Sequence, residues 1–377
     1  MSDSPPFALP ASPRPAPPPP SRRRLGGFLL FTSCLFNFLF LIGLGIVLLF
    51  LIFGSSSTTP LREQHIAGTA SARNKIAVIH IDGIILEGLL TYIEKQIDQA
   101  AADDEVKAVV VRITSPGGSI TASDRVYRRL KELRDGNLEK STNPKPLVVS
   151  MGAVAASGGY YVAMPAKSIF AEPTTLTGSI GVYIALPNVH ELTDKYGFKM
   201  EVMKRGAVKY AGSPFATLKP EEREMWQELV DHSFAQFKEV VEDARPQLKG
   251  KLEEKVIDEK RTVLDNDGKN PTAIQYVRRL ADGGVFTADQ AQRFHLVDKI
   301  GYQEDAIKEA KELASVGSNY QAIQYEKPFS FFESLLGAKA SSPKEGGFSQ
   351  LAEGLTPRLW YLTPGFDLTG IVSASQR

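Results

Sequence analysis

An uncharged apolar run near the N-terminus constrains this chain more than any other feature. From Phe28 to Phe53 no residue is charged, and leucine, isoleucine, valine and phenylalanine dominate the run. A helix of about 20 apolar residues is long enough to cross a hydrocarbon core about 30 Å thick. A cleaved signal peptide has a shorter apolar stretch, of about 7–15 residues. The run therefore predicts one uncleaved transmembrane helix over residues 28–53.

The charges beside this run predict its orientation in the membrane. Arginines occupy positions 22–24 just before it, whereas Arg62 is the first basic residue after it. Loops on the cytoplasmic side of membrane proteins carry an excess of lysine and arginine. We therefore expect a single-pass protein of the cell membrane, held in lipid by this helix. Residues 1–27 would form a disordered, proline- and arginine-rich cytoplasmic tail, and the rest of the chain would be extracytoplasmic.

Composition narrows the chemistry of the remaining chain. Lysine plus arginine number 44 and aspartate plus glutamate 43, so the net charge of +1 does not favour a nucleic-acid partner. The single cysteine, Cys34, excludes disulfides and cysteine-rich metal sites. The five histidines show no metal-binding spacing, and none lies beside a glycine-rich turn. We expect no metal and no cofactor.

Alternating patterns after the apolar run predict the fold class. Residues 54–73 are rich in serine and threonine and have no periodicity, which predicts a linker. Beyond them, β-branched runs alternate with segments of helical spacing, which predicts an α/β core with largely parallel strands buried on both faces. The expected strands are 76–81, 106–113, 147–151, 168–171 and 181–186, and the expected helices are 91–102, 120–133 and a long one from Pro220.

The C-terminal third divides into two parts. A last α/β portion runs from residue 273 to about 314, and the sequence then becomes rich in glycine, serine and proline. Such a composition predicts mostly irregular structure. We therefore expect a catalytic domain over residues 74–320 and an irregular extension over residues 321–377.

Ser157 is the first candidate for chemistry. It follows the third expected strand and precedes Gly158 and Gly159. A serine at a strand-to-helix corner has its hydroxyl beside free backbone N–H groups, although the same pattern suits a serine that only caps the helix. Gly117 and Gly118 follow the second expected strand. They could present N–H groups to an oxyanion or could form an ordinary Pro-Gly turn.

A serine nucleophile also needs a base, and no histidine is placed to serve. A lysine can take this part when burial away from water lowers its pKa toward neutrality. Lys209 has small and apolar neighbours that suit a dry site, but Lys204 lies in the same stretch. These residues alone do not decide between the two lysines.

Four segments together resemble the signal peptide peptidase A family of serine proteases, which belongs to the crotonase and Clp-protease fold group. The likeness covers roughly residues 74–315, and the segments are Ser115–Gly118, Met151–Tyr161, Thr177–Val182 and Lys204–Lys209. The resemblance implies that Ser157 is the nucleophile and Lys209 the general base. It also implies that Ser179 orients the lysine and that the backbone of Gly117 and Gly118 forms the oxyanion hole.

The resemblance further implies an overall activity and assembly. The chain is similar to the short, single-domain form of the family, which forms a homo-oligomeric ring or dome. The expected function is that of a membrane-anchored serine endopeptidase that cleaves hydrophobic peptides such as signal-peptide remnants. Tyr210, Phe215 and His295 stand where the family commonly has other residues, which leaves the substrate preference open. The alternatives are a crotonase-type acyl-CoA enzyme and an inactive membrane scaffold of the same fold.

Overall fold

The computed structural model describes residues 31–45, 60–139, 143–265, 267–326 and 359–362. The chain divides into two units, Met1–Pro60 and Leu61–Arg377. In the first unit, residues 31–45 form a helix that falls within the predicted membrane span. Among the described residues, no helix has both the length and the apolar character needed to cross a membrane. The rest of the predicted 28–53 span and the whole 1–27 tail lie outside the described residues.

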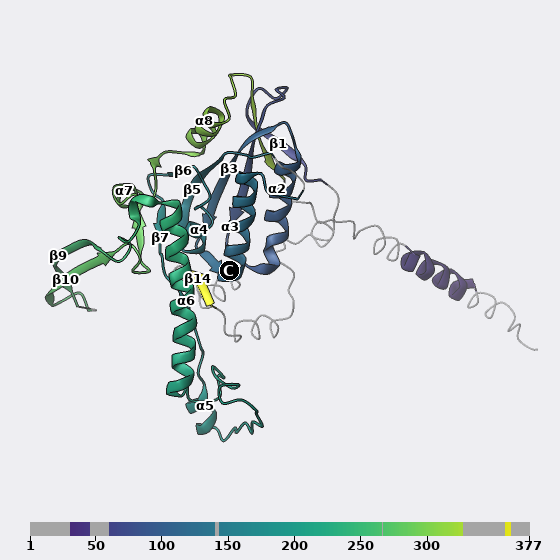
Figure 1. Ribbon diagram of the computed structural model, residues 1–377. Coiled ribbons are helices and arrows are strands. Elements are labelled where there is room, and N and C mark those ends of the chain that lie inside the picture. The colour runs from purple at the N-terminus through teal and green to yellow at the C-terminus, as the bar shows by residue number, and fades with distance from the viewer. Residues whose placement is uncertain (1–30, 46–59, 140–142, 266, 327–358, 363–377) are drawn as a thin grey trace, which may run out of the picture. The chain divides into compact units, whose positions relative to one another are not determined.

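A largely parallel sheet forms the centre of the second unit (Figure 1). Its strand order is β1-β13-β2-β3-β5-β6-β12, and β7 and β11 extend it from β5. Strands β2, β3, β5 and β6 pair in parallel with their neighbours in this path, which confirms the predicted α/β core. The bounds are β1 Glu63–Gly68, β2 Lys75–Asp82, β3 Val106–Ser115, β5 Leu147–Ala156, β6 Ser168–Ala171, β7 Leu176–Gly178, β11 Val285–Thr287, β12 Lys299–Ile300 and β13 Gln321–Tyr325.

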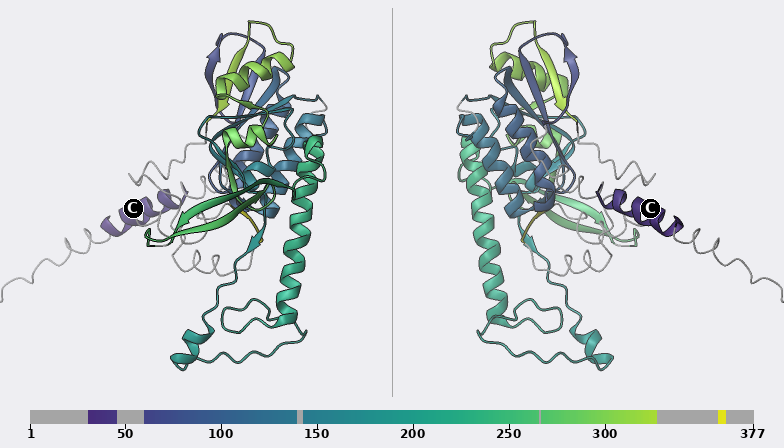
Figure 2. Two further views of the ribbon diagram at one scale, coloured as in Figure 1. Left: turned by 90° about the vertical axis from the view of Figure 1, so that its left-hand side faces the viewer. Right: turned by 90° about the vertical axis from the view of Figure 1, so that its right-hand side faces the viewer.

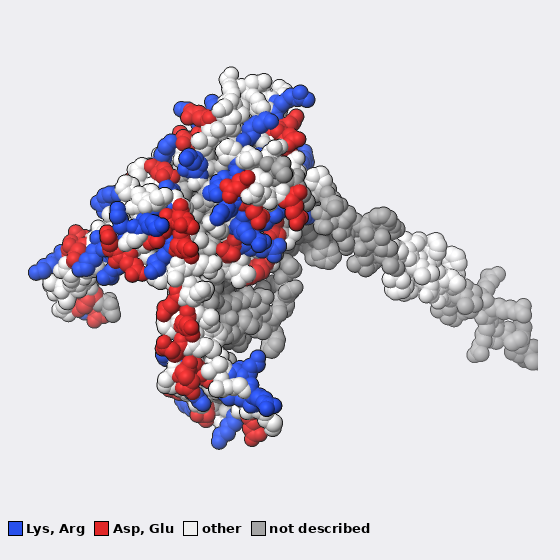
Figure 3. All heavy atoms as spheres, viewed as in Figure 1, with Lys and Arg blue, Asp and Glu red and all other residues white. Residues whose placement is uncertain are grey.

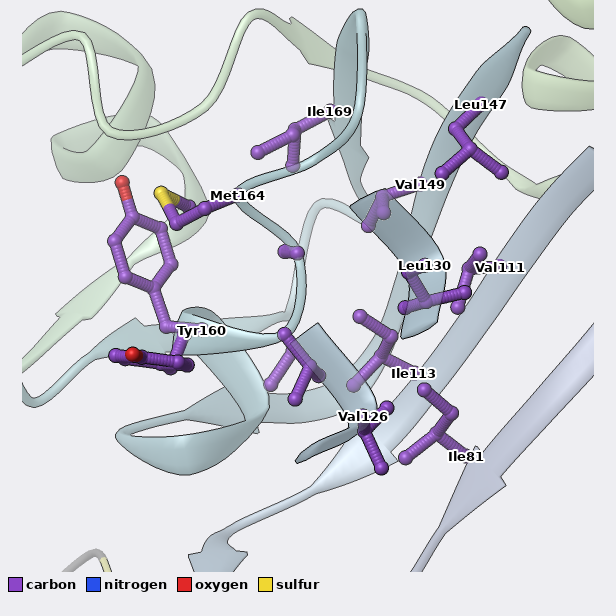
Figure 4. Packing of buried hydrophobic residues seen from close by; sticks show 14 of the residues in the cluster. Ile81, Val111, Ile113, Val126, Leu130, Leu147, Val149, Tyr160, Met164 and Ile169 are labelled. Atoms are coloured by element: carbon purple, nitrogen blue, oxygen red, sulfur yellow. The ribbon is translucent and has the colours of Figure 1, made fainter. Parts of the chain in front are cut away.

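Helices cover both faces of this sheet, which explains why its central strands have continuous apolar sequences. Side chains of β3 alternate between the faces. Val111 and Ile113 pack with Val126 and Leu130 of α3 (Figure 4), whereas Val110 belongs to the core under α8. Burying aliphatic side chains in this way contributes about 1.5–3 kcal/mol each to folding. The covering helices are α2 Leu90–Ala102 and α3 Ile120–Asp135 on one face and α8 Gln303–Leu313 on the other.

The long helix expected from Pro220 is α6, Pro220–Ala244. Pro220 occupies the first turn, where a missing N–H costs nothing, and the Glu222 carboxylate accepts a hydrogen bond from the Lys219 N–H at 3.2 Å. Figures 1 and 2 show α6 leading away from the main sheet toward α5, His190–Lys195. Residues 185–219, which connect β8 (Tyr183–Ile184) to α6, therefore lie mostly at the end of α6 farthest from the sheet.

The C-terminal end of α6 is joined to the sheet by an ion pair between the buried Arg245 and the solvent-accessible Asp298. The Arg245 guanidinium donates to both carboxylate oxygens of Asp298, at 2.5 and 3.1 Å. One of those oxygens also accepts the Ile169 N–H at 2.7 Å, so the pair reaches strand β6. The remaining elements are η1 Glu87–Leu89, α4 Gly158–Tyr161, η2 Pro246–Leu248, α7 Ala288–Arg293 and an antiparallel hairpin of β9 Lys255–Leu264 and β10 Pro271–Arg279.

Three strands occur where irregular structure was expected. Strand β1 lies within the expected 54–73 linker, and β13 and β14 (Leu359–Leu362) lie within the expected 321–377 extension. Strand β1 pairs antiparallel with β13, which in turn pairs in parallel with β2. These segments are short and partly polar, so their own sequences give a weak strand signal. Pairing with distant strands overrides such weak local preferences.

Candidate active site

Ser157 stands at the corner between β5 and α4. Its backbone has φ 55° and ψ −117°, a sparsely populated conformation for a residue other than glycine. Holding such a residue costs about 1–3 kcal/mol, and strain of this kind often occurs at active sites. The corner is fixed by pairing of Ala156 with Gly178 and by donation of the Ser157 N–H to the Gly178 carbonyl at 2.8 Å.

The side chain of Ser157 is fully buried, and among the described residues its Oγ has no hydrogen-bond partner. It makes no capping hydrogen bond to α4. The alternative interpretation of Ser157 as a helix cap is therefore not supported by the structure. Buried hydroxyls without a partner are uncommon, and each one calls for a specific explanation.

Gly118 presents its backbone amide to the side of β4 (Gly117–Ser119) that faces away from Ile85. The Ile85 N–H donates to the Gly117 carbonyl, and the Ser119 N–H donates to the Ile85 carbonyl, both at 2.9 Å. Because backbone groups of successive strand residues point in opposite directions, the N–H of Gly118 points away from Ile85. The N–H of Gly117 is already used, since it donates to Ser115 Oγ at 3.1 Å.

Gly158 provides a second amide at the same place. It is the first residue of α4, where the N–H group has no partner inside the helix. A Cβ at Gly117 would lie 2.7 Å from the Gly158 nitrogen, and a Cβ at Gly158 would lie 3.1 Å from the Gly118 nitrogen. The amides of Gly118 and Gly158 therefore converge beside Ser157. The sequence did not single out Gly158, although its place directly after the serine at a helix start was the available signal.

Ser179 and Lys209 differ in where the structure places them. Ser179 follows Gly178, which contacts the Ser157 backbone, but its own Oγ donates to the Gly283 carbonyl at 2.9 Å. Lys209 lies exposed in the segment between α5 and α6. It makes no hydrogen bond to Ser157, whose Oγ has no partner. Within one chain, the described structure brings together Ser157, Ser179, Gly117 and Gly118 but does not join Lys209 to them.

A cluster of packed aromatic rings lies beside α4 and includes Tyr361 of β14. The Tyr361 side chain is fully buried, with its ring centroid 4.5 Å from that of Phe237 and 5.2 Å from that of Tyr161. Its hydroxyl donates to the Ser233 carbonyl at 2.9 Å. Burial and the nearby Asp124 carboxylate raise the pKa of Tyr361, so the phenol stays a neutral donor.

A separate cavity of about 360 Å³ lies between β8, α6 and the segment that precedes α6. Ile184, Leu186 and Trp226 contribute to its lining, but Ser157 does not. The Trp226 Nε1 atom is buried, with no hydrogen-bond partner among the described residues. In the part of the chain that the structure describes, no three or more His, Cys, Asp or Glu side chains form a cluster able to hold a metal.

Comparisons with known proteins identify the family of this chain. The model of peptidase family S49 matches residues 139–260 and 269–317. The chain is 34% identical over 246 residues to a putative protease of Synechocystis sp., and these cover 65% of this chain and 76% of that protein. It is 33% identical over 254 residues to Protease 4 of Salmonella typhi, covering 66% and 36%. It is 30% identical over 245 residues to the putative signal peptide peptidase SppA of Enterococcus faecium, covering 65% and 62%.

The extent of these matches varies. The chain spans between about a third and about three quarters of the length of these curated relatives. Among solved structures, a ClpP1 variant from Listeria monocytogenes is 12% identical, covering 61% of this chain and 94% of that one. Its TM-score of 0.33 is too low to carry a conclusion about this chain. The family expected from the four sequence segments is confirmed by the family model and by the Synechocystis relative, and the chain belongs to peptidase family S49.

Proposed function

We propose that this protein is a membrane-anchored serine endopeptidase with Ser157 as its nucleophile and Lys209 as its general base. One observation carries the proposal. Ser157 is held in a strained strand-to-helix corner, with an unpartnered Oγ, beside the convergent amides of Gly118 and Gly158. A nucleophile on a strained turn next to backbone N–H groups is the arrangement that acyl transfer requires. Membership of peptidase family S49 favours a protease over a crotonase-type acyl-CoA enzyme.

The proposed reaction proceeds through an acyl-enzyme. The neutral Lys209 amine takes the proton from Ser157 Oγ as that oxygen attacks the carbonyl carbon of the peptide bond. The N–H groups of Gly118 and Gly158 donate to the oxyanion. Lys209 then returns the proton to the leaving amine, and the peptide C–N bond breaks. In the second half, Lys209 takes a proton from water as the water oxygen attacks the ester carbon. Lys209 then gives that proton to Ser157 Oγ as the ester C–O bond breaks, which releases the new carboxyl end and restores both side chains.

We further propose that the Lys209 amine reaches Ser157 of a neighbouring copy in a homo-oligomeric ring. The segment around Lys209 carries large apolar side chains in contact with solvent, and the exposed fraction is 76% for Tyr196, 54% for Phe198 and 97% for Met203. Exposed apolar surface of this kind is typical of protein–protein contacts. Packing this segment against another subunit would bury it and remove water from the lysine. Neutral lysine is favoured in such a dry site. Head-to-tail contacts of this type generate rings.

The proposed substrates are extended hydrophobic peptides, such as the remnants of signal peptides, and the proposed location is the extracytoplasmic face of the cell membrane. The uncharged run from Phe28 to Phe53 supports the anchor, because its length and apolar character suit a helix that crosses a bilayer. Figure 3 shows Lys and Arg interspersed with Asp and Glu over the visible face of the described residues. Such mixed charge offers no continuous basic surface for nucleic acid.

Mixing two inactive variants tests this proposal. Neither Ser157→Ala nor Lys209→Ala is expected to cleave peptides alone. When equal amounts are unfolded and refolded together, about a quarter of the sites in a ring would combine an intact serine with an intact neighbouring lysine. We therefore expect about a quarter of wild-type kcat in the mixture, measured with a fluorogenic peptide.

Two outcomes would count against the proposal. A mixture that stays inactive, although mass spectrometry of intact oligomers shows mixed rings, contradicts the sharing of sites between subunits. Cleavage by the Lys209→Ala protein alone contradicts the dyad itself. An inactive scaffold is distinguished by a serine-directed acylating probe, which would fail to label Ser157 in the wild-type protein.

Replacing Gly158 with alanine tests the proposed oxyanion site. The new Cβ would lie 3.1 Å from the Gly118 nitrogen and 2.5 Å from Ser123 Oγ, within the space needed by the oxyanion. Alanine keeps the backbone N–H, but its Cβ would hold the oxyanion away from that donor. Loss of one oxyanion hydrogen bond typically lowers kcat about 10²- to 10³-fold, and we expect a loss of this size. Gly88→Ala is the matched control, because a Cβ there meets no atom within 4 Å. Equal kcat for the two variants, with unchanged melting temperatures, would remove Gly158 from the site.

A further inference from the structure

The turn between β10 and β11 holds Ser179 in place. Its Gly283 carbonyl accepts the Ser179 hydroxyl at 2.9 Å, and its Gly284 carbonyl accepts the Ser179 N–H, also at 2.9 Å. The Gly283 N–H donates in return to the Ile180 carbonyl at 3.1 Å. Ser179 has φ 52°, an uncommon conformation for a residue other than glycine. Such a conformation persists only where the surrounding structure holds it, and the hydrogen bonds with this turn do so.

Two charged side chains build the turn. The Asp282 carboxylate accepts the N–H of Gly284 at 2.9 Å and that of Arg279 at 3.1 Å. The Arg278 guanidinium donates to both oxygens of the same carboxylate, at 2.6 and 3.1 Å. Burial would raise the pKa of Asp282, but these hydrogen bonds hold that pKa below its usual value, so the carboxylate stays charged. The pair of Arg278 and Asp282 therefore fixes the backbone on either side of Gly283.

The same guanidinium also contacts β11, which pairs with β7 beside the serine corner. Arg278 donates to the Val285 carbonyl at 3.3 Å and lies 4.5 Å from the centroid of the Phe286 ring. The Phe286 ring is buried against Gly178, where a Cβ would lie 2.9 Å from it. The Gly178 carbonyl accepts the Ser157 N–H at 2.8 Å. A continuous path of contacts therefore runs from Arg278 to the backbone of Ser157.

The hydrogen bond from Ser179 to Gly283 also fixes the direction of the hydroxyl proton. A carbonyl can only accept, so the Ser179 proton is used there and its oxygen keeps lone pairs for accepting. The proposed base, the neutral amine of Lys209, has N–H groups to donate and a single lone pair. When Ser179 accepts one of these N–H groups, the lone pair stays free for the proton of Ser157. A Ser179 hydroxyl turned the other way would donate to that lone pair and compete with Ser157.

We propose that Arg278 and Asp282 are positioning residues that keep the Ser179 hydroxyl an acceptor, and so leave the lone pair of Lys209 to the nucleophile. This inference rests on the proposed function. In this role neither side chain contacts the substrate or the reacting atoms. Both act through the turn, because the Gly283 carbonyl that they hold in place is the group that orients Ser179.

An Arg278→Met substitution in the full-length protein tests the proposal, because methionine keeps an apolar stem but cannot bind Asp282. General-base catalysis typically contributes about 10²- to 10⁴-fold, and we expect a partial loss of about 10-fold in kcat with KM nearly unchanged. The acidic limb of the pH profile of kcat/KM should also shift to lower pH, because a hydroxyl that donates to the amine favours its neutral form. A lower melting temperature without any shift of that limb would overturn the proposal, since it indicates a merely structural pair.

Arg261→Met is the matched control within the same hairpin. Arg261 lies 3.8 Å from the centroid of the Tyr276 ring and pairs with Glu259, so these contacts stay within β9 and β10. This variant should keep the kcat and the pH profile of the wild type. Asp282→Asn should resemble Arg278→Met. Arg278→Lys keeps the charge but not the two-pronged geometry, so it should recover only part of the loss. Equal effects of Arg261→Met and Arg278→Met would contradict the assignment.

Hydrogen exchange followed by mass spectrometry separates failure of this inference from failure of the proposed function. Exchange at the N–H groups of Ser157 and Ser179 should be faster in Arg278→Met than in the wild type, while exchange in β3 should not change. If the wild type cleaves no peptide but this exchange pattern holds, the function fails and the support of the turn stands. If the wild type cleaves peptides through Ser157, an unchanged kcat and pH profile in Arg278→Met overturns the inference whatever the exchange shows, and the function stands.

Discussion

Replacing Ser157 with alanine is expected to abolish peptide cleavage, with a fall in kcat of about 10⁶-fold, the size seen when a serine protease loses its nucleophile. The reason is chemical, because the substitution removes the hydroxyl of the residue at the corner between β5 and α4, beside the amides of Gly118 and Gly158. The fold should survive. Ser157 Oγ makes no hydrogen bond within the described structure, so its removal leaves no buried group without a partner. Cleavage of a fluorogenic peptide gives kcat, and thermal unfolding gives the stability.

Ser123 offers a matched control for this substitution. It is also fully buried, and its Oγ likewise has no hydrogen-bond partner among the described residues. Ser123→Ala removes the same atom in a similar environment, in helix α3, and should keep kcat within a few-fold of wild type. If both variants cleave at the wild-type rate, Ser157 is not the nucleophile. If both are inactive and unstable, the loss reflects packing rather than chemistry.

Replacing Lys209 with alanine should lower kcat by several orders of magnitude, because the Ser157 hydroxyl would lose the group that accepts its proton. Lys204 is the natural control, since it lies in the same exposed segment and its ammonium already donates to the Ala207 carbonyl at 2.8 Å. Lys204→Ala should cleave nearly as fast as wild type. Oligomeric state, measured by analytical ultracentrifugation, should be the same for both variants. Inactivity of Lys204→Ala together with activity of Lys209→Ala would reassign the base.

The central strands could be predicted because burial on both faces leaves a simple trace in the sequence. Strands β2 and β3 have nearly continuous runs of isoleucine and valine, and glycine-bearing turns follow them. The same reasoning made Ser157 a candidate, but the pattern suited a helix cap equally well, and its role as nucleophile was implied by the family resemblance. The long helix at Pro220 was predictable from its first turn.

The remaining features depend on contacts that sequence position does not reveal. The role proposed for Gly158 depends on its backbone N–H, a group that every residue except proline carries, so it leaves no signal in the composition. Strand β14 is only four residues long and pairs with β4, far earlier in the chain. Within a single chain the Lys209 side chain makes no hydrogen bond with Ser157 Oγ. The sequence therefore could not predict the geometry by which the two side chains would come into contact. A site completed by a second copy is invisible to arguments about one copy.

The insertion of β13 between β1 and β2 has a consequence for how the polypeptide matures. Strand β1, made early in translation, has no place in the sheet until residues 321–325 leave the ribosome. Until then the β2 backbone offers a row of unsatisfied amides and carbonyls, which invites pairing with other nascent chains. A chain truncated after α8 would lack β13, so the edge of β2 would stay unpaired in it.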